Sequence, residues 1–473
     1  MWSKEGGEGG GLTTVAKAHA AKAVAEREAA NRALAEQAAP KRIAAERAVA
    51  EKAAADRAAM ETAAAMEAEA LPDSGVEKAG RETYAPSWRH RATMRLVARR
   101  IAGVCVSDAR VAALDGSWLL TGGFGERPSR GLRQHLLDGA VWRELPAAPL
   151  SDRGGHAIGT AGGLALLHGG YGHGTQQGNQ SCLWAASLQE GVPAWRRLSP
   201  TGAAPLARAG HTLTAISDNE LIMFGGFGER AFDDVHLLRL GSDGQAEWSQ
   251  LAADGESPGP RCAHAAVPVP GGGGVLTFGG YTSTHGADAA LSLLEVSISA
   301  AGGRRCAWRP LHAMPPLGDD GDDGDGGDDG DGGDGGDGGD GGGELGELRR
   351  LGRSGHSAVV TRGERLHVYG GTRDNSSGAE PGGAQVLSDA LSLDVSAEGI
   401  ERLCDPHGGA RWERLPLTVD GGDDDHEWLA RYNHAAAVVV GGNGAEEMLI
   451  VGGSDVSHMP VDTAAALSLV LSD

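Results

Sequence analysis

The order of hydrophobic and polar positions in residues 207–251 predicts four short strands. Two stretches alternate between apolar and polar side chains, and between them an apolar run at residues 221–224 ends at Gly225 and Gly226. Trp248 lies in a last short segment. Alternation and short apolar runs bounded by Gly, Asp and Asn are typical of strands. Because a lone four-stranded sheet cannot bury both of its faces, we expect this unit to pack against similar neighbours.

The same features recur in a fixed order along the chain. A pair of glycines follows an apolar run at Gly122-Gly123, Gly169-Gly170, Gly225-Gly226, Gly279-Gly280, Gly370-Gly371 and Gly452-Gly453. An Arg-x-x-His element precedes the last five pairs, at Arg153/His156, Arg208/His211, Arg261/His264, Arg353/His356 and Arg431/His434. A tryptophan follows the first five pairs, at Trp142, Trp195, Trp248, Trp308 and Trp412. A period near 50 residues with these features is typical of kelch repeats, which build propellers.

On these motifs, residues 85–473 resemble a kelch-repeat β-propeller. The resemblance implies an all-β, six-bladed propeller with one small sheet for each glycine pair. The first copy departs from the pattern, because Asp108 stands near the expected His and no Arg stands three residues before it. The last copy has no tryptophan strand of its own. We therefore expect the segment around Trp88 to supply the outer strand of the last sheet and to join the two chain ends, which removes unpaired edges.

A narrower resemblance gives an alternative function. Within kelch proteins, the Gly-Gly-Phe-Gly-Glu-Arg run at residues 122–127 and the Arg-Gln-His-Leu-Leu run at residues 133–137 are similar to the propeller of tRNA wybutosine-synthesising protein 4, a relative of leucine carboxyl methyltransferases. This resemblance implies an accessory propeller for tRNA wybutosine synthesis. Nothing before residue 85 resembles the strand, Gly-rich turn and helix units of a methyltransferase, so the chain would lack a catalytic domain of its own.

Composition separates two further segments from the propeller. Residues 1–84 begin glycine-rich and continue rich in Ala, Glu, Arg and Lys, which predicts a helical or disordered extension that is solvent-exposed, forms a short coiled coil or docks a partner. Residues 318–343 contain 11 aspartates among glycines and predict a disordered loop. The net charge of −22 argues against binding to the phosphate backbone of nucleic acids, so tRNA is a partner only under the alternative.

The sequence predicts neither an enzyme nor a metal site. The five cysteines stand apart, without a Cys-x-x-Cys pair, so we expect a reducing compartment, cytoplasm or nucleus, and no zinc. A copper oxidase of the kelch type would need paired Tyr and His with a Tyr–Cys link, which these residues do not supply. There is no nucleophile elbow, no apolar signal segment and no stretch of transmembrane length, and we expect no cofactor.

Architecture is the simplest explanation of the recurring residues. Glycines permit close backbone approach and positive φ, tryptophans fill the space between sheets, and Arg and His are expected to hydrogen-bond the backbone of the neighbouring sheet. Function should then lie in loops. In a four-stranded blade, the loop after the second strand and the loop that joins successive blades open on the same face.

The loops after the second strands hold the candidate binding residues. They are Phe124, Arg127, Arg130, Tyr171, His173, Phe227, Arg230, Tyr281, His285 and Arg373, with Asn375, Ser454 and His458 at the remaining places. Aromatic residues and arginine together are typical of binding hot spots, and Arg and His on one face of an acidic chain favour an acidic peptide or a phosphate group. We therefore expect a non-enzymatic scaffold that binds a protein partner through one propeller face. Its oligomeric state stays open.

Overall fold

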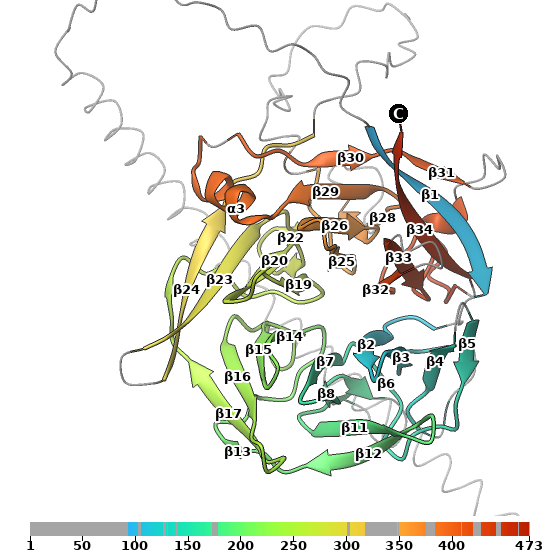
Figure 1. Ribbon diagram of the computed structural model, residues 1–473, viewed down its shortest axis with the longest axis vertical. Helices are drawn as coiled ribbons and strands as arrows, with labels where there is room; N and C mark the ends of the chain where they lie inside the picture. The colour runs from blue at the N-terminus through green and yellow to red at the C-terminus, as the bar shows by residue number, and fades with distance from the viewer. Residues whose placement is uncertain are drawn as a thin grey trace, which may run out of the picture. The chain divides into compact units, whose positions relative to one another are not determined.

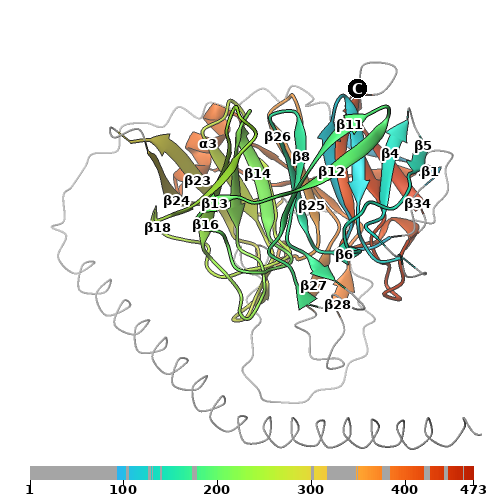
Figure 2. The same cartoon turned by 90° about the horizontal axis from the view of Figure 1, so that it is seen from below.

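Figures 1 and 2 show the computed structural model of the protein. The chain divides into two units, Met1–Arg89 and His90–Asp473. The structure describes residues 93–102, 106–125, 129, 131–138, 141–172, 178–299, 303–316, 348, 350–374, 384–407, 409–419, 427–440, 446–461 and 463–472. Several predictions concern residues outside these ranges: the extension at residues 1–84, the acidic run at residues 318–343, Trp88, Arg127, Arg130, His173 and Asn375.

The described residues form an all-β fold made mostly of short antiparallel sheets. Six sheets have four or five strands each, and three smaller sheets have two or three. Sheet 1 comprises β2 (Arg110–Leu114), β3 (Ser117–Thr121), β4 (Gln134–Asp138) and β5 (Val141–Glu144). Sheet 2 comprises β7 (Ala157–Ala161), β8 (Leu164–His168), β11 (Leu183–Gln189) and β12 (Val192–Leu198). Sheet 3 comprises β14 (Thr212–Ser217), β15 (Glu220–Phe224), β16 (Val235–Leu240) and β17 (Ala246–Leu251), with β13 (Thr201–Gly202) parallel to β17.

The other three large sheets repeat this order. Sheet 4 comprises β19 (Ala265–Pro268), β20 (Gly274–Phe278), β23 (Leu291–Ile298) and β24 (Arg304–Leu311), with β18 (Ala253–Gly255) parallel to β24. Sheet 5 comprises β25 (Ser357–Val360), β26 (Arg365–Tyr369), β29 (Ala390–Asp394) and β30 (Glu413–Leu415). Sheet 6 comprises β32 (Ala435–Val440), β33 (Glu446–Val451), β34 (Thr463–Ser472) and β1 (Thr93–Ala102), with β31 (Leu417–Val419) parallel to β1. In Figure 1 the first strands β2, β7, β14, β19, β25 and β32 lie nearest the centre, and the fourth strands lie outside.

The two ends of the folded unit meet in sheet 6. β1 pairs with β34 in an antiparallel register that runs from Thr93 opposite Ser472 to Ala102 opposite Thr463, and Figure 1 shows the two strands side by side. This pairing confirms that an early segment of the chain supplies the outer strand of the last sheet. Pairing the first strand with the last gives each of them a hydrogen-bonded neighbour and covers edges that would otherwise be open.

The apolar core lies between neighbouring sheets. Trp412 of sheet 5 is buried in one cluster with Phe278 and Leu291 of sheet 4, and the Trp412 and Phe278 ring centroids are 5.0 Å apart. In the same way, Trp308 of sheet 4 packs against Phe224 of sheet 3, with ring centroids 4.7 Å apart. A large indole buries more apolar area than any other side chain, which is why a tryptophan recurs where one sheet packs on the next.

One helix in the described part of the chain was not predicted. α3 (Ala397–Cys404) follows β29, and its N-cap Ser396 accepts a hydrogen bond from the Gly399 backbone N–H. The helix buries Leu403 against sheet 4, where the Leu403 carbonyl accepts from the His312 N–H at 2.7 Å. A short 3-10 turn, η2 (Glu427–Leu429), precedes sheet 6. No helix of the described residues has the length and apolar character needed to cross a membrane.

Candidate functional site

A circle of backbone hydrogen bonds joins the repeats near the axis. The residue that precedes the His of each Arg-x-x-His element has a positive φ, and so does its counterpart before sheet 1: Asp108, Gly155, Gly210, Ala263, Gly355 and Asn433. Each donates its backbone N–H to the carbonyl oxygen of its counterpart in the previous repeat, at 2.7–3.0 Å, and Asp108 donates to Asn433. The six bonds therefore form a closed loop, which requires a left-handed backbone at each of these positions.

This circle corrects the sequence interpretation of the first copy. Asp108 does not lie at the place of the histidines but one residue earlier, at the place of Gly155. Ala109 then takes the histidine position and Val106 the arginine position. The Val106 carbonyl accepts from the Gly453 N–H at 2.7 Å, as the Arg153 carbonyl accepts from the Gly123 N–H at 2.8 Å. The backbone arrangement is thus kept in the first repeat without either side chain.

The repeated arginines join the connecting segment to the glycine pair. In each of the five, a guanidinium nitrogen donates to the carbonyl of the first glycine of its own repeat, as Arg208 does to Gly225 at 2.9 Å. The arginine carbonyl in turn accepts from the second glycine of the previous repeat. The neighbouring sheet is therefore reached by the backbone of the arginine, whereas its side chain bonds within its own repeat. Buried Arg208 and Arg353 also pair with Asp234 and Asp389.

The repeated histidines are buried in the wall and neutral. In four of the five, Nε2 contacts a side chain of the previous repeat, as His264 contacts the Thr212 hydroxyl at 3.1 Å and His434 contacts the Ser357 hydroxyl at 2.8 Å. Burial lowers the pKa of His264 and of His434 to about 3. These contacts join side chains, and His356 and His434 also have backbone hydrogen bonds at Phe278 and Tyr369 of the previous repeat, as the sequence analysis expected. Their place between sheets supports a structural role.

Six pairings place the loop after each second strand beside the loop that enters the same sheet, as predicted. The bridges are Ser107 with Phe124, Ala209 with Phe227, Cys262 with Tyr281, Ser354 with Thr372 and Tyr432 with Ser454, and in sheet 2 β6 (Arg153–Gly154) pairs with β9 (Tyr171–Gly172). β27 (Thr372–Asp374) and β28 (Ala384–Val386) extend the pairing in repeat 5. Figure 2 shows β6, β27 and β28 at the same lower end of the sheets. We call the surface formed by these paired loops the loop face.

The residue directly after the glycine pair is aromatic in four consecutive repeats. These residues are Phe124, Tyr171, Phe227 and Tyr281, whereas repeats 5 and 6 have Thr372 and Ser454. Phe227 and Tyr281, in adjacent repeats, are 51% and 49% exposed. Phe124 and Tyr171 are half-buried. The structure thus brings the four predicted aromatic residues onto one face, with the two most exposed in repeats 3 and 4.

The described basic candidates on the loop face differ in their exposure and in the hydrogen bonds that they form within the protein. Arg230 is exposed, and its guanidinium carbon lies 5.2 Å from the Phe232 ring centroid. His285 is exposed, with Nδ1 2.8 Å from the Thr284 hydroxyl. Arg373 is half-buried and donates to the Arg350 carbonyl and to Gln385, and burial lowers its pKa. Arg230 and His285 are therefore the described basic side chains most open to a partner.

Sequence reasoning missed exposed aliphatic residues in the last repeat. Val456 and Met459, in the loop after Gly452-Gly453, are 66% and 56% exposed. His458 in the same loop contacts the Tyr432 hydroxyl through Nδ1 at 2.8 Å. These residues belong to the loop face because Ser454 bridges to Tyr432. Their signal in the sequence was weak, since two aliphatic residues in a polar loop form no pattern.

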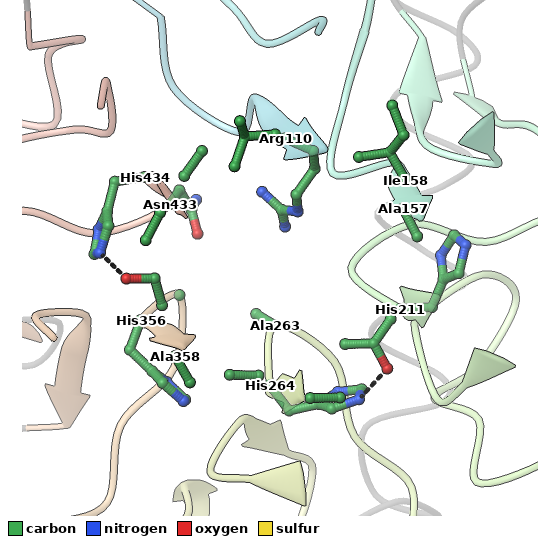
Figure 3. A pocket seen from close by; sticks show the side chains of 18 of the residues that line it. Arg110, Ala157, Ile158, His211, Ala263, His264, His356, Ala358, Asn433 and His434 are labelled. Atoms are coloured by element: carbon green, nitrogen blue, oxygen red, sulfur yellow. Dashed lines mark hydrogen bonds between the residues drawn. The ribbon is translucent and has the colours of Figure 1, made fainter. Parts of the chain in front are cut away.

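A cavity of about 160 Å³ lies at the centre, between the first strands. Figure 3 shows the Arg110 side chain of β2 pointing into it, opposite residues of β14, β19, β25 and β32. Among the described residues there is no grouping of three or more His, Cys, Asp or Glu suited to a metal ion. Arg110 was not predicted, because a single arginine in an alternating strand looks like an ordinary surface residue.

A family model and a relative named for kelch repeats match part of this chain. Residues 122–280 match the family model described as the KLHDC2/KLHL20/DRC7 Kelch-repeats domain. Adagio-like protein 3 of Oryza sativa subsp. japonica is 32% identical over 199 residues, covering 38% of this chain and 30% of that protein. An F-box/kelch-repeat protein of Arabidopsis thaliana is 31% identical over 190 residues, 35% of this chain and 38% of that protein. These matches and the sheet topology support a kelch-repeat protein.

Two further matches define the limits of the comparison. Acyl-CoA-binding domain-containing protein 4 of Arabidopsis thaliana is 29% identical over 188 residues, which cover 38% of this chain and 26% of that protein. The chain therefore spans only about a quarter to two fifths of these three relatives. The solved structure of YjhT aligns with a TM-score of 0.49 at 14% identity, over 78% of this chain and 98% of that one.

Proposed function

We propose that this kelch-repeat protein is a six-bladed, non-enzymatic scaffold that binds a protein partner through its loop face. Six large sheets of the described residues, the closed circle of six backbone hydrogen bonds and the pairing of β1 with β34 support a closed ring. In such a ring the repeated Arg, His and Trp residues serve packing, and the loops remain free to vary and to bind.

The observation that carries the proposal is the exposure of Phe227 and Tyr281 in adjacent repeats. An aromatic side chain offers about 150–250 Å² of area, so half of one leaves roughly 100 Å² to bury. At about 25 cal/mol per Å², that area is worth up to about 2.5 kcal/mol for each ring. Binding costs reduce this gain, and we expect about 1–2 kcal/mol for each residue.

Charge suggests the chemistry of the partner. Exposed Arg230 and His285 lie on the loop face of a chain with net charge −22. A partner segment would complement this surface if its apolar residues packed on Phe227 and Tyr281. Carboxylates flanking those residues would lie near Arg230 and His285. Exposed Glu229 and Asp233 beside Arg230 weaken this attraction, so apolar contact is expected to supply most of the affinity.

The names of the relatives favour a binding role without assigning a partner. One relative is named as an F-box/kelch-repeat protein, which supports kelch repeats as a module joined to other functions. Another, serine/threonine-protein phosphatase BSL2 of Arabidopsis thaliana, is 25% identical over 345 residues, 69% of this chain but 29% of that protein. Its activity is not transferred to this chain. The accessory role in wybutosine synthesis stays a prediction from residues 122–127 and 133–137.

Affinity capture with the full-length chain tests the proposal. We would compare the natural protein, the pair of substitutions Phe227→Ala and Tyr281→Ala, and a control pair, Val141→Ala and Ile298→Ala. The control residues are 58% and 67% exposed and lie at or beside the turns between third and fourth strands, at the opposite end of the sheets. Proteins retained by the natural chain and the control but lost from the loop-face variant would support the proposal. Equal retention by all three would contradict it.

A further inference from the structure

The central cavity differs chemically from the rest of the propeller interior. Its lining comes from the first strands of the sheets and from the residues of the hydrogen-bond circle that precede them. Eight of the twenty lining residues are alanine or glycine: Ala157, Ala263, Ala265, Ala266, Ala358, Ala435 and Ala436, with Gly355. One long charged side chain, Arg110, reaches into this space (Figure 3).

Arg110 is not explained by the repeat. The matching residues, each directly after the histidine position, are Ala157, Thr212, Ala265, Ser357 and Ala435. The five repeated arginines each bond a glycine carbonyl, whereas Arg110 donates one hydrogen bond of 2.9 Å to the carbonyl of its own neighbour, Ala109. Among the described residues it has no ion-pair partner. Arg110 is half-buried, and burial lowers its pKa although Asp108 opposes the shift. A bound anion would use the guanidinium donors that the protein leaves free.

The surroundings contain donors and no carboxylate. No Asp or Glu is among the described residues that line the cavity, and Thr212, Thr214 and Ser357 contribute hydroxyls. The lining histidines His264 and His434 are uncharged at neutral pH, since burial lowers the pKa of each to about 3. The nearest acid is Asp108, whose pKa burial raises although Arg110 and Asn433 oppose the shift. Asp108 does not form an ion pair with Arg110 among the described residues, although the two groups interact electrostatically.

We infer that the central cavity binds a small oxyanion, with Arg110 as its charged anchor. A volume of about 160 Å³ is several times the roughly 30 Å³ that one water occupies in the liquid, so a phosphate ion or a small carboxylate has room to enter. The net charge of −22 repels anions at long range, so the affinity rests on the local contacts with Arg110. The site is separate from Phe227 and Tyr281, and its test does not depend on a protein partner.

Titration calorimetry on the full-length chain tests the inference with two probes, sodium phosphate and sodium succinate, against sodium chloride at equal ionic strength. Saturable binding of phosphate alone would assign a phosphate site, and binding of succinate alone a carboxylate site. Arg110→Gln, which removes the charge and keeps a polar side chain, should weaken binding at least tenfold. Arg196→Gln, an exposed arginine on β12, makes the same change of charge and should bind as the natural chain does.

Melting temperatures show whether the Arg110→Gln variant is folded, so that weaker binding can be assigned to the lost charge. Because Arg110 is half-buried and has no ion-pair partner among the described residues, Arg110→Gln should melt at about the temperature of the natural chain without anion, and phosphate or succinate should no longer raise that temperature. If Arg110→Gln does not fold, Arg110→Lys keeps a cation without the planar fork and should bind several-fold more weakly. No binding of either probe to the natural chain up to about 10 mM, or equal binding by the natural chain and the Arg110 variants, would overturn the inference.

Discussion

The Asp108 backbone N–H donates to the Asn433 carbonyl at 2.8 Å, and this bond joins the first repeat to the last. Five equivalent bonds link the other repeats, so the circle near the axis is complete. The same two ends of the chain meet again at the outside, where β1 pairs with β34. The ring is thus closed at its inner and its outer radius by bonds between different segments.

The outer closure should be sensitive to a charge in β1. Ala98 is fully buried, pairs with Leu467 and belongs to a cluster with Tyr369 and Leu415. Ala98→Asp places an unpaired carboxylate there, and we expect a loss of about 3 kcal/mol in the free energy of unfolding, measured by urea denaturation. Val141→Asp, at a residue 58% exposed, is the control and should change stability by less than about 0.5 kcal/mol. Equal effects of the two would argue against the closure.

The first glycine of each pair should not tolerate a side chain. Gly225 has φ +66, and a Cβ there would lie 2.8 Å from the Arg261 carbonyl oxygen and 2.9 Å from His264 Cε1. Gly225→Ala combines left-handed strain with a clash against the next repeat, and we expect a loss of about 2–4 kcal/mol. Gly259→Ala isolates the strain, since Gly259 has φ +81 with nothing within 4 Å. It should cost about 1 kcal/mol, and thermal unfolding of both variants checks the difference.

The buried arginine of repeat 3 should matter far more than its exposed neighbour. Arg208 is fully buried and lies 4.0 Å above the Phe232 ring centroid, while exposed Arg230 lies at 5.2 Å. Burial alone would raise the pKa of Asp234, but hydrogen bonds from Arg208 and His236 outweigh it and hold that pKa well below its usual value. Arg208→Met should cost about 3–5 kcal/mol, because Asp234 keeps only its contact with His236 and the Gly225 carbonyl loses the hydrogen bond from Arg208. Arg230→Met should cost less than about 1 kcal/mol by denaturant unfolding.

The wall histidines predict acid-sensitive stability. Burial lowers the pKa of His264 and His434 to about 3 and holds those of His156, His211 and His356 well below the usual value. An unfolded histidine titrates near pH 6.5, so between about pH 6.5 and 3 the unfolded state binds more protons than the folded one. The free energy of unfolding therefore has its full value above that window. It falls as the pH drops through the window, by up to about 1.4 kcal/mol per pH unit for each histidine.

A substitution at His264 measures the contribution of one histidine to the pH dependence of stability. His264→Gln keeps a polar side chain opposite Thr212 and removes one titrating group. Its unfolding free energy, measured by urea denaturation between pH 7 and pH 5, should fall less steeply with acid than that of the natural chain, by about one proton. His285→Gln, at an exposed residue, should leave the slope unchanged. A slope that His264→Gln does not alter would mean that the folded protein admits the proton.

Much of the fold follows from spacing, and the missed features show what spacing lacks. The glycine pairs and the tryptophans occupy recurrent places, as at Gly225 and Trp248, because period and residue size set them. The circle of hydrogen bonds could not be predicted, since it depends on a positive backbone φ, which Ala263 and Asn433 adopt here as well as Gly155. Because φ cannot be read from residue type alone, the position of Asp108 in the repeat was also assigned wrongly from the sequence.

The sequence predicted the position of the candidate site better than it predicted the exposure and hydrogen bonding of the basic residues there. The aromatic residues after the glycine pairs lie together on the loop face because the repeat fixes where that loop emerges. The state of each basic residue depended on local partners, which is why Arg373 is half-buried and bonded to Gln385 whereas Arg230 is exposed. Arg110 belongs to no recurring pattern, and only the arrangement of the first strands around the cavity reveals it.

Hydrogen exchange of the full-length chain, with and without a partner obtained by capture, tests the central claim most directly. The account predicts slower exchange on binding at the backbone amides of residues 227–231 and 281–287, in the loops after the second strands of sheets 3 and 4. It predicts no change at the turns around Val141 and Val192, at the opposite end of the sheets. Protection confined to those turns, or spread over the outer strands with the loop face unaffected, would contradict the account.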